Sequence, residues 1–289
     1  MRLPGPFEIL RLLEFEWPHR DPGFLLRNVT PADVAATRTG ADARFVDPVT
    51  RQFIMSFHSL VVRTPRGNLL VDACVGNHKE RPLLPEWHQQ EWPYLERLAA
   101  MGLSPADIDF VCCTHLHGDH VGWNTRLQDG QWIPTFPNAR YLFAAGELSY
   151  WENYHAVDPG NPYERPWADS VLPVIAAGQV DRVATDHEIL PGICLRHAPG
   201  HTPGNVVIEL DDGRRRAVMT GDVLHHPIQI ERPHWCSQFD IDPYQAMDTR
   251  LSLLERVADS GTTVLGAHFA HPAALKIVRD GDGFFYANA

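Results

Sequence analysis

Short apolar runs separated by glycine and proline turns recur along the chain, and they predict a succession of β-strands with a few helices between them. Residues 53–62 alternate loosely between apolar and polar positions. After the turn at 65–68 comes the apolar run 69–72, so this segment predicts a hairpin. Residues 108–113 form a nearly continuous apolar run that ends abruptly in polar residues. Such a run is typical of a buried strand that delivers a loop to a site.

Two segments have helical spacing. Residues 93–101 place apolar side chains three and four positions apart, and Gly102 is a suitable C-terminal stop. Asp242 followed by Pro243 predicts a second helix start, because a capping carboxylate and a proline at the first helical position both favour it. The apolar face predicted for this second helix is Met247, Leu251, Leu254 and Ala258.

Strands and helices alternate in both halves of the chain, with no low-complexity linker between them. The strands predicted in the second half are 193–197, 206–210, 217–220 and 262–265. We therefore predict one α/β domain over residues 46–289, preceded by an N-terminal arm over residues 1–45 that could form a homodimer interface or roof a pocket. Residues 145–180 form an insertion rich in aromatic residues and proline without a clear period. A lid or pocket wall and surface filler explain this insertion equally well.

Composition narrows the class of partner. The formal net charge of −11 at pH 7 argues against nucleic acid and against an anionic membrane, because phosphate surfaces repel such a field. The basic run 214–216 lies beside Asp211 and Asp212, which is typical of a solvated turn. The five cysteines are odd in number and scattered, without a disulfide framework. No signal-peptide core and no long apolar run is found, so we expect a cytoplasmic protein with a small-molecule substrate.

The decisive motif is the run His115-Leu116-His117-Gly118-Asp119-His120, directly after the predicted strand 108–113. Imidazole and carboxylate are ligands that borderline cations such as Zn²⁺ prefer, and a tight loop can direct alternate side chains at different ions. Histidines that merely cap a turn are the alternative. Three further ligand-type residues follow predicted strands, each next to a small residue. These are His201, Asp222 and His268. Together with the first run they supply enough ligands for two metal ions.

The order of Asp72, the HxHxDH run, His201, Asp222 and His268 resembles the metallo-β-lactamase superfamily over about residues 50–280. The resemblance implies a four-layer αββα sandwich with two mixed sheets and the metal site at one edge. It implies that the first metal is held by His115, His117 and His201. It implies that the second is held by Asp119, His120 and His268, and that Asp222 bridges both. Asp72 matches the family's structural aspartate, which orders the ligand loop without binding metal.

Within the superfamily, the stretch Gly221–His225 and the stretch Gln238–Asp242 resemble the methyl parathion hydrolase-like branch. Quorum-quenching lactonases share the ligand set but typically carry tyrosine where this chain has His225. The resemblance implies that His225 lies near the pocket and can donate a hydrogen bond to a substrate oxygen. A packed histidine is the equal alternative.

These residues predict a hydrolase in which two divalent ions activate a bridging water for attack on a carbonyl or phosphoryl centre. Zinc is the first choice of metal, with manganese, iron or cobalt as alternatives, and the candidate catalytic residues are Asp119, Asp222 and His225. Trp123 and Trp151 indicate an apolar pocket for a carboxyl ester, a lactone or an organophosphate triester. Core packing is the default alternative for both tryptophans. An iron-containing redox enzyme and a non-catalytic metal-binding effector remain open as alternative functions.

Overall fold

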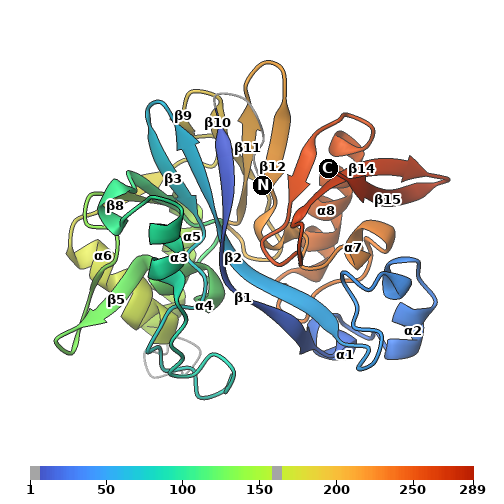
Figure 1. Ribbon diagram of the computed structural model, residues 1–289, viewed down its shortest axis with the longest axis horizontal. Coiled ribbons are helices and arrows are strands. Elements are labelled where there is room, and N and C mark those ends of the chain that lie inside the picture. The colour runs from blue at the N-terminus through green and yellow to red at the C-terminus, as the bar shows by residue number, and fades with distance from the viewer. Residues whose placement is uncertain (1–6, 158–164) are drawn as a thin grey trace. The chain divides into compact units, whose positions relative to one another are not determined.

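A computed structural model of the chain describes residues 7–157 and 165–289. It contains two large β-sheets with helices packed on them (Figure 1). The chain divides into two compact units. The first comprises residues up to Phe15 together with Phe57–Ala184, and the second comprises Glu16–Ser56 and Thr185–Ala289. The division into an arm over 1–45 and a domain over 46–289 stays a prediction.

The first sheet has six strands. In order across the sheet they are β1 (Glu8–Arg20), β2 (Phe53–Thr64), β3 (Gly67–Val71), β4 (Phe110–Cys112), β7 (Arg140–Ala144) and β8 (Val180–Val183). The predicted hairpin is confirmed, because β2 and β3 pair antiparallel, with Leu60 opposite Val71. From β3 to β8 the strands run parallel, which explains why β4 is apolar on both faces. The edge strand β1 comes from the predicted arm.

Helices cover the sheet of the first unit. They are α3 (Tyr94–Ala100), α4 (Gly118–Val121), α5 (Ala145–Val157) and α6 (Leu172–Ala176), with the short turns η2 (Pro105–Asp107) and η3 (Gly122–Asn124) and the π-helical turn η5 (Trp167–Val171). The predicted helix 93–101 is confirmed as α3, which ends before Gly102 at φ +75°. Leu98 and Leu148 share a buried core with Val111 of β4. The small sheet of β5 (Thr125–Gln128) and β6 (Gln131–Pro134) completes the unit.

The insertion 145–180 is more regular than its sequence predicts. The absence of a period led us to expect an irregular segment, but α5, η5 and α6 make most of its described residues helical. The reason is that α5 buries Glu147 beside Leu148, so its inner face is not a continuous apolar stripe. Residues 158–164 of the insertion lie outside the described residues.

The second unit contains a seven-stranded sheet. In order across the sheet its strands are β15 (Gly283–Asn288), β14 (Ala274–Asp280), β13 (Thr263–Leu265), β12 (Arg216–Met219), β11 (Val206–Asp211), β10 (Ile193–His197) and β9 (Glu188–Leu190). Only β12 and β13 pair in parallel, and all other neighbours in this sheet are antiparallel. As a result β10, β12 and β13 point the same way, and their carboxyl ends meet at one edge of the sheet.

Helix α8 (Pro243–Val257) packs on this sheet, and its start is as predicted. Asp242 caps it by accepting hydrogen bonds from the backbone N–H groups of Tyr244 and Gln245. Of the predicted apolar face, Leu254 is buried, and Leu251 and Ala258 pack partly buried against the core, but the buried face is centred about one position earlier along the helix. The residues that are buried are Ala246, Arg250, Leu253, Leu254 and Val257. A buried arginine belongs to this face, so apolar side chains alone do not mark it.

Shorter elements connect the strands of the second unit. They are α1 (Pro22–Leu25), α2 (Pro31–Ala35), η1 (Thr39–Ala41), η6 (Gly221–Val223) and α7 (Ile228–Glu231). Across residues 7–157 and 165–289, none of the helices combines the length and the apolar character that crossing a membrane requires.

Candidate metal centre

The first group of candidate ligands lies in the loop after β4. The chain leaves the buried strand at Cys112, and helix α4 begins at Gly118 with His117 at its N-cap position. His115 and His120 are fully buried, whereas His117 and Asp119 are partly exposed. The Nε2 atom of His115 lies 3.1 Å from Nδ1 of His117. Two nitrogens bound to one tetrahedral zinc ion with bonds of 2.0–2.1 Å are roughly 3.3 Å apart, so this spacing fits shared coordination.

Asp72 fixes this loop. It follows β3 at φ +56°, and its Oδ1 accepts the backbone N–H of Thr114 at 2.7 Å. Its Oδ2 lies 3.0 Å from Nδ1 of His120. A carboxylate beside Nδ1 of a histidine leaves Nε2, on the other side of the ring, available for a metal, which is the usual arrangement behind a metal ligand. These contacts agree with the ordering role that the family resemblance implies for Asp72.

Glu147, which the sequence did not single out, supports the same loop. Its side chain is buried, and its Oε1 accepts the backbone N–H of Leu116 at 3.0 Å and the indole N–H of Trp151 at 2.7 Å. The ring of Trp151 meets the ring of His117 edge-on, with centroids 5.5 Å apart. Trp151 therefore contacts a candidate ligand directly.

Trp123 has a different place. Its side chain is 4% exposed, stacks on Tyr94 with centroids 4.8 Å apart, and donates its indole N–H to Glu14. Burial raises the pKa of Glu14 to about 7, although hydrogen bonds from Val75, Gly76 and Trp123 lower it. Since the ring face and the only donor of Trp123 are used inside the first unit, the core alternative describes this residue.

The second group of candidate ligands lies at the common edge where β10, β12 and β13 end. His201 follows β10, Asp222 lies in η6 after β12, and His268 follows β13. All three side chains are buried. Nε2 of His201 lies 3.3 Å from Oδ2 of Asp222, and Nε2 of His268 lies 3.2 Å from Oδ1. Each oxygen of Asp222 thus faces a different histidine, as a carboxylate that bridges two ions requires.

The Nδ1 atoms of His201 and His268 also lie within hydrogen-bonding distance of oxygen atoms. Nδ1 of His201 lies 3.0 Å from Oδ1 of Asp240, and Nδ1 of His268 lies 3.1 Å from the carbonyl oxygen of Ser56. Burial alone would raise the pKa of Asp240. The hydrogen bond from His201 and the neighbouring positive charges outweigh burial, and they hold the pKa below its ordinary value. Both rings therefore present Nε2 to Asp222, which fits metal ligation.

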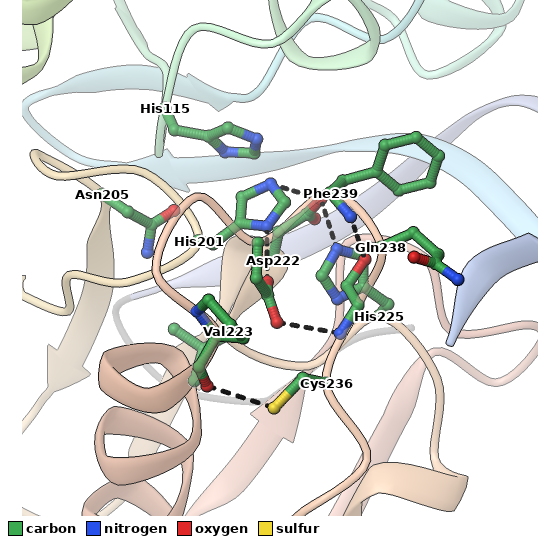
Figure 2. A network of polar contacts seen from close by, with 12 residues as sticks. His115, His201, Asn205, Asp222, Val223, His225, Cys236, Gln238 and Phe239 are labelled. Carbon is green, nitrogen blue, oxygen red and sulfur yellow. Dashed lines mark hydrogen bonds and ion pairs between the residues drawn. The ribbon is translucent and has the colours of Figure 1, made fainter. Parts of the chain in front are cut away.

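His225 joins this group. It is buried, and its Nε2 lies 3.2 Å from Oδ2 of Asp222 (Figure 2). Burial lowers the pKa of His225, although the charge of Asp222 acts in the opposite direction. The ring is therefore neutral at pH 7 and carries one N–H. Ligand atoms of His201, His225 and Asp240 all lie within 4.8 Å of one another, so His225 is part of the polar group rather than of the apolar core.

The structure thus brings His115, His117, Asp119 and His120 together in the first unit, and His201, Asp222 and His268 together in the second. The donor chemistry, imidazoles backed by carboxylates or carbonyls, fits divalent metal ions of the zinc type in both groups. Sequence reasoning missed Glu14, Glu147, Asp240 and Arg250, which are buried. Of these four residues, only Asp240 could have been found from the sequence, because it lies in the stretch 238–242 that supported the resemblance.

The chain is similar to several known proteins. An N-acyl homoserine lactonase of Bacillus sp is 24% identical over 206 residues, which cover 67% of this chain and 70% of that protein. A probable metallo-hydrolase of Mycobacterium tuberculosis is 24% identical over 241 residues, with 76% and 73% covered.

Among solved structures, the hydrolase AbOPH of the beta lactamase superfamily superposes with a TM-score of 0.81 at 23% identity, covering 99% of this chain and 96% of that one. AidC, a dizinc quorum-quenching lactonase in complex with a product, N-hexnoyl-L-homoserine, also gives 0.81, at 20% identity and with 99% and 95% covered. These likenesses confirm the predicted αββα metallo-β-lactamase fold. Residues 58–268, well over half of the chain, match the description "Metallo-beta-lactamase superfamily". The chain belongs to the metallo-β-lactamase superfamily.

Proposed function

We propose that the chain is a dinuclear metal-dependent hydrolase that cleaves an ester-type bond in a hydrophobic small molecule. The first ion is assigned to His115, His117 and His201, and the second to Asp119, His120 and His268, with Asp222 bridging. The observation that carries the proposal is the position of Asp222, whose two oxygens face His201 and His268 separately. The family match, which includes all seven residues, supports joining the two groups into one centre.

Bound divalent ions, with zinc as the first choice, supply an activated water and polarise the bond under attack. The chain's own residues then have distinct tasks. Asp222, with a buried carboxylate between the imidazoles of His201 and His268, accepts the proton of the attacking water and can pass it to the leaving oxygen. Asp119 contributes a second carboxylate beside His120, with its Oδ2 3.9 Å from Nε2 of that histidine.

His225 is assigned to substrate. It is neutral, it holds one N–H, and its backbone is fixed because its own N–H donates to Oε1 of Gln229 at 2.8 Å. A fixed neutral donor next to Asp222 suits a hydrogen bond to the oxygen of an ester carbonyl or phosphoryl group. Trp151, in contact with His117, offers an apolar surface for the rest of the substrate.

The substrate class is a carboxyl ester, a lactone or an organophosphate triester. Two similar proteins support the lactone within this range, because one is an N-acyl homoserine lactonase and another is a quorum-quenching lactonase seen with its product. A cytoplasmic location and a homodimer are also part of the proposal. The location rests on the scattered cysteines, and the homodimer rests on the N-terminal segment of the sequence.

The test is a panel of aryl esters, lactones, thioesters and phosphotriesters assayed on protein loaded with zinc, manganese or iron. Asp222→Asn is the matched variant, because it keeps the shape of the side chain and removes the bridging charge. We expect turnover of at least one ester class by the native chain and its loss in Asp222→Asn. Flat rates on every substrate with metal bound would favour the effector alternative, and redox activity confined to iron-loaded protein would favour the redox alternative.

A further inference from the structure

Helix α8 supports the loop that carries His201. Gly200 has φ +126°, and a Cβ added there would lie 2.1 Å from the backbone nitrogen of Ala246 in the first turns of α8. One turn further on, the hydroxyl of Thr249 donates to the carbonyl oxygen of Pro199 at 2.6 Å. The residues before His201 therefore rest directly on one face of this helix.

Arg250 on the same face is buried to the last atom, at 0% exposure. Its Nε donates to the carbonyl oxygen of Val223 at 2.9 Å, and its Nη1 donates to the carbonyl oxygen of Pro233 at 2.7 Å. Val223 directly follows Asp222, so the guanidinium holds the backbone that presents the proposed bridging carboxylate.

The same guanidinium lies close to Asp240, whose carboxylate faces His201. Nη2 of Arg250 lies 3.7 Å from Oδ2 of Asp240, and both side chains are fully buried. Oδ2 of Asp240 also accepts the backbone N–H of Ser237 at 2.8 Å, while Oδ1 faces Nδ1 of His201 at 3.0 Å. One buried cation thus has direct contact with the loop of Asp222 and indirect contact with the ring of His201.

We infer that Arg250 is a positioning residue of the metal centre, which fixes Asp222 through Val223 and His201 through Asp240. Burying an ion pair is costly, and replacing one by apolar residues of similar volume is often neutral or stabilising, so fold stability alone explains Arg250 poorly. Holding two ligands from different loops at a set distance does explain it, because an outer partner that orients a ligand strengthens metal binding. The inference rests on the proposed metal centre and is independent of the substrate.

The test compares Arg250→Met with Leu253→Ala, a core variant on the same helix. For each protein, the affinity for zinc is measured by competition with a chromogenic chelator, and the melting temperature is measured on metal-free protein. We expect Arg250→Met to weaken the binding of at least one ion by about tenfold or more. We expect Leu253→Ala to lower the melting temperature while its zinc affinities stay native. An Arg250→Met protein with native zinc affinities would overturn the inference.

A double-variant cycle tests the route through Asp240. If Arg250 acts on His201 through Asp240, the loss of zinc affinity in Arg250→Met combined with Asp240→Asn is smaller than the product of the two single losses. Multiplicative losses would overturn that route. Should the native chain bind no zinc, the metal centre itself would fail, which is distinct from native binding that Arg250→Met leaves unchanged.

Discussion

Replacing Gly200 by alanine tests how closely the His201 loop is fitted to α8. The added Cβ would lie 2.1 Å from the backbone nitrogen of Ala246 and 2.4 Å from its Cα, whereas real Cβ contacts essentially never fall below 3.0 Å. Both atoms belong to backbone, so they cannot rotate away. The loop must therefore move by about 1 Å, and His201 is the next residue along it. A misplacement of about 1 Å in a catalytic site can cost roughly 100-fold in rate.

The backbone conformation adds a separate cost. Gly200 has φ +126°, a region that side chains rarely adopt, and such strain costs about 1–3 kcal/mol. Gly213→Ala is the matched control, since Gly213 also has positive φ, at +80°, but has nothing within 4 Å of the added atom. Gly146→Ala controls for the substitution itself, in open space and without a positive φ.

The assay measures metal content after dialysis, the rate on the best substrate of the panel, and the melting temperature. We expect Gly200→Ala to retain less metal after dialysis and to have a rate about 100-fold lower than the native chain. For Gly213→Ala we expect only a modest fall in melting temperature. The reasoning would be refuted if Gly200→Ala kept native metal content and rate, because the contact with α8 would then not position His201.

Three further predictions follow from other parts of the structure. Burial lowers the pKa of Lys79 to about 7 despite its neighbour Asp169, so between pH 7 and 10.5 the unfolded chain holds more protons than the folded one and stability rises with pH. Between pH 7 and 9, Lys79→Met should remove about 2 kcal/mol of the rise in the free energy of unfolding, measured by urea unfolding at each pH. An equal dependence of the free energy of unfolding on pH in both proteins would contradict this. Asp72→Asn keeps the positive φ but weakens the hold on His120, so chelator competition should show about 10–100-fold weaker metal binding, and native affinity would argue against the role of Asp72. Leu254→Ala should cost about 2–5 kcal/mol by cavity formation, measured by denaturant unfolding, and a change under 1 kcal/mol would contradict its core position.

Much of the site could be predicted because metal ligands leave a local signal. His115, His117, Asp119 and His120 lie within one short loop, and the remaining ligands each follow a strand whose apolar run is visible in the sequence. Strands that run in the same direction within one sheet end at the same edge. The structure places His201, Asp222 and His268 at one edge, as this rule requires.

The supporting residues could not be predicted, because they depend on contacts between distant parts of the chain. Arg250 interrupts the apolar pattern of α8, and a charged residue in a helix ordinarily indicates a solvent-facing position. Its burial depends on carbonyl groups that no sequence pattern reveals. Glu147 likewise interrupts the apolar face of α5, so the sequence shows no helical period there. Trp123 was assigned to a pocket because it follows the ligand loop, but its partner Glu14 lies 109 positions away.

The central proposal is that a single pair of metal ions is held by the seven candidate ligands. Anomalous diffraction at the zinc edge, on crystals of the zinc-loaded chain, tests it most directly. The account predicts two peaks roughly 3.5–4 Å apart, with Asp222 bound to both and with histidines of both groups as ligands. Zinc bound by only one of the two groups, or with Asp222 bound to neither ion, would contradict it.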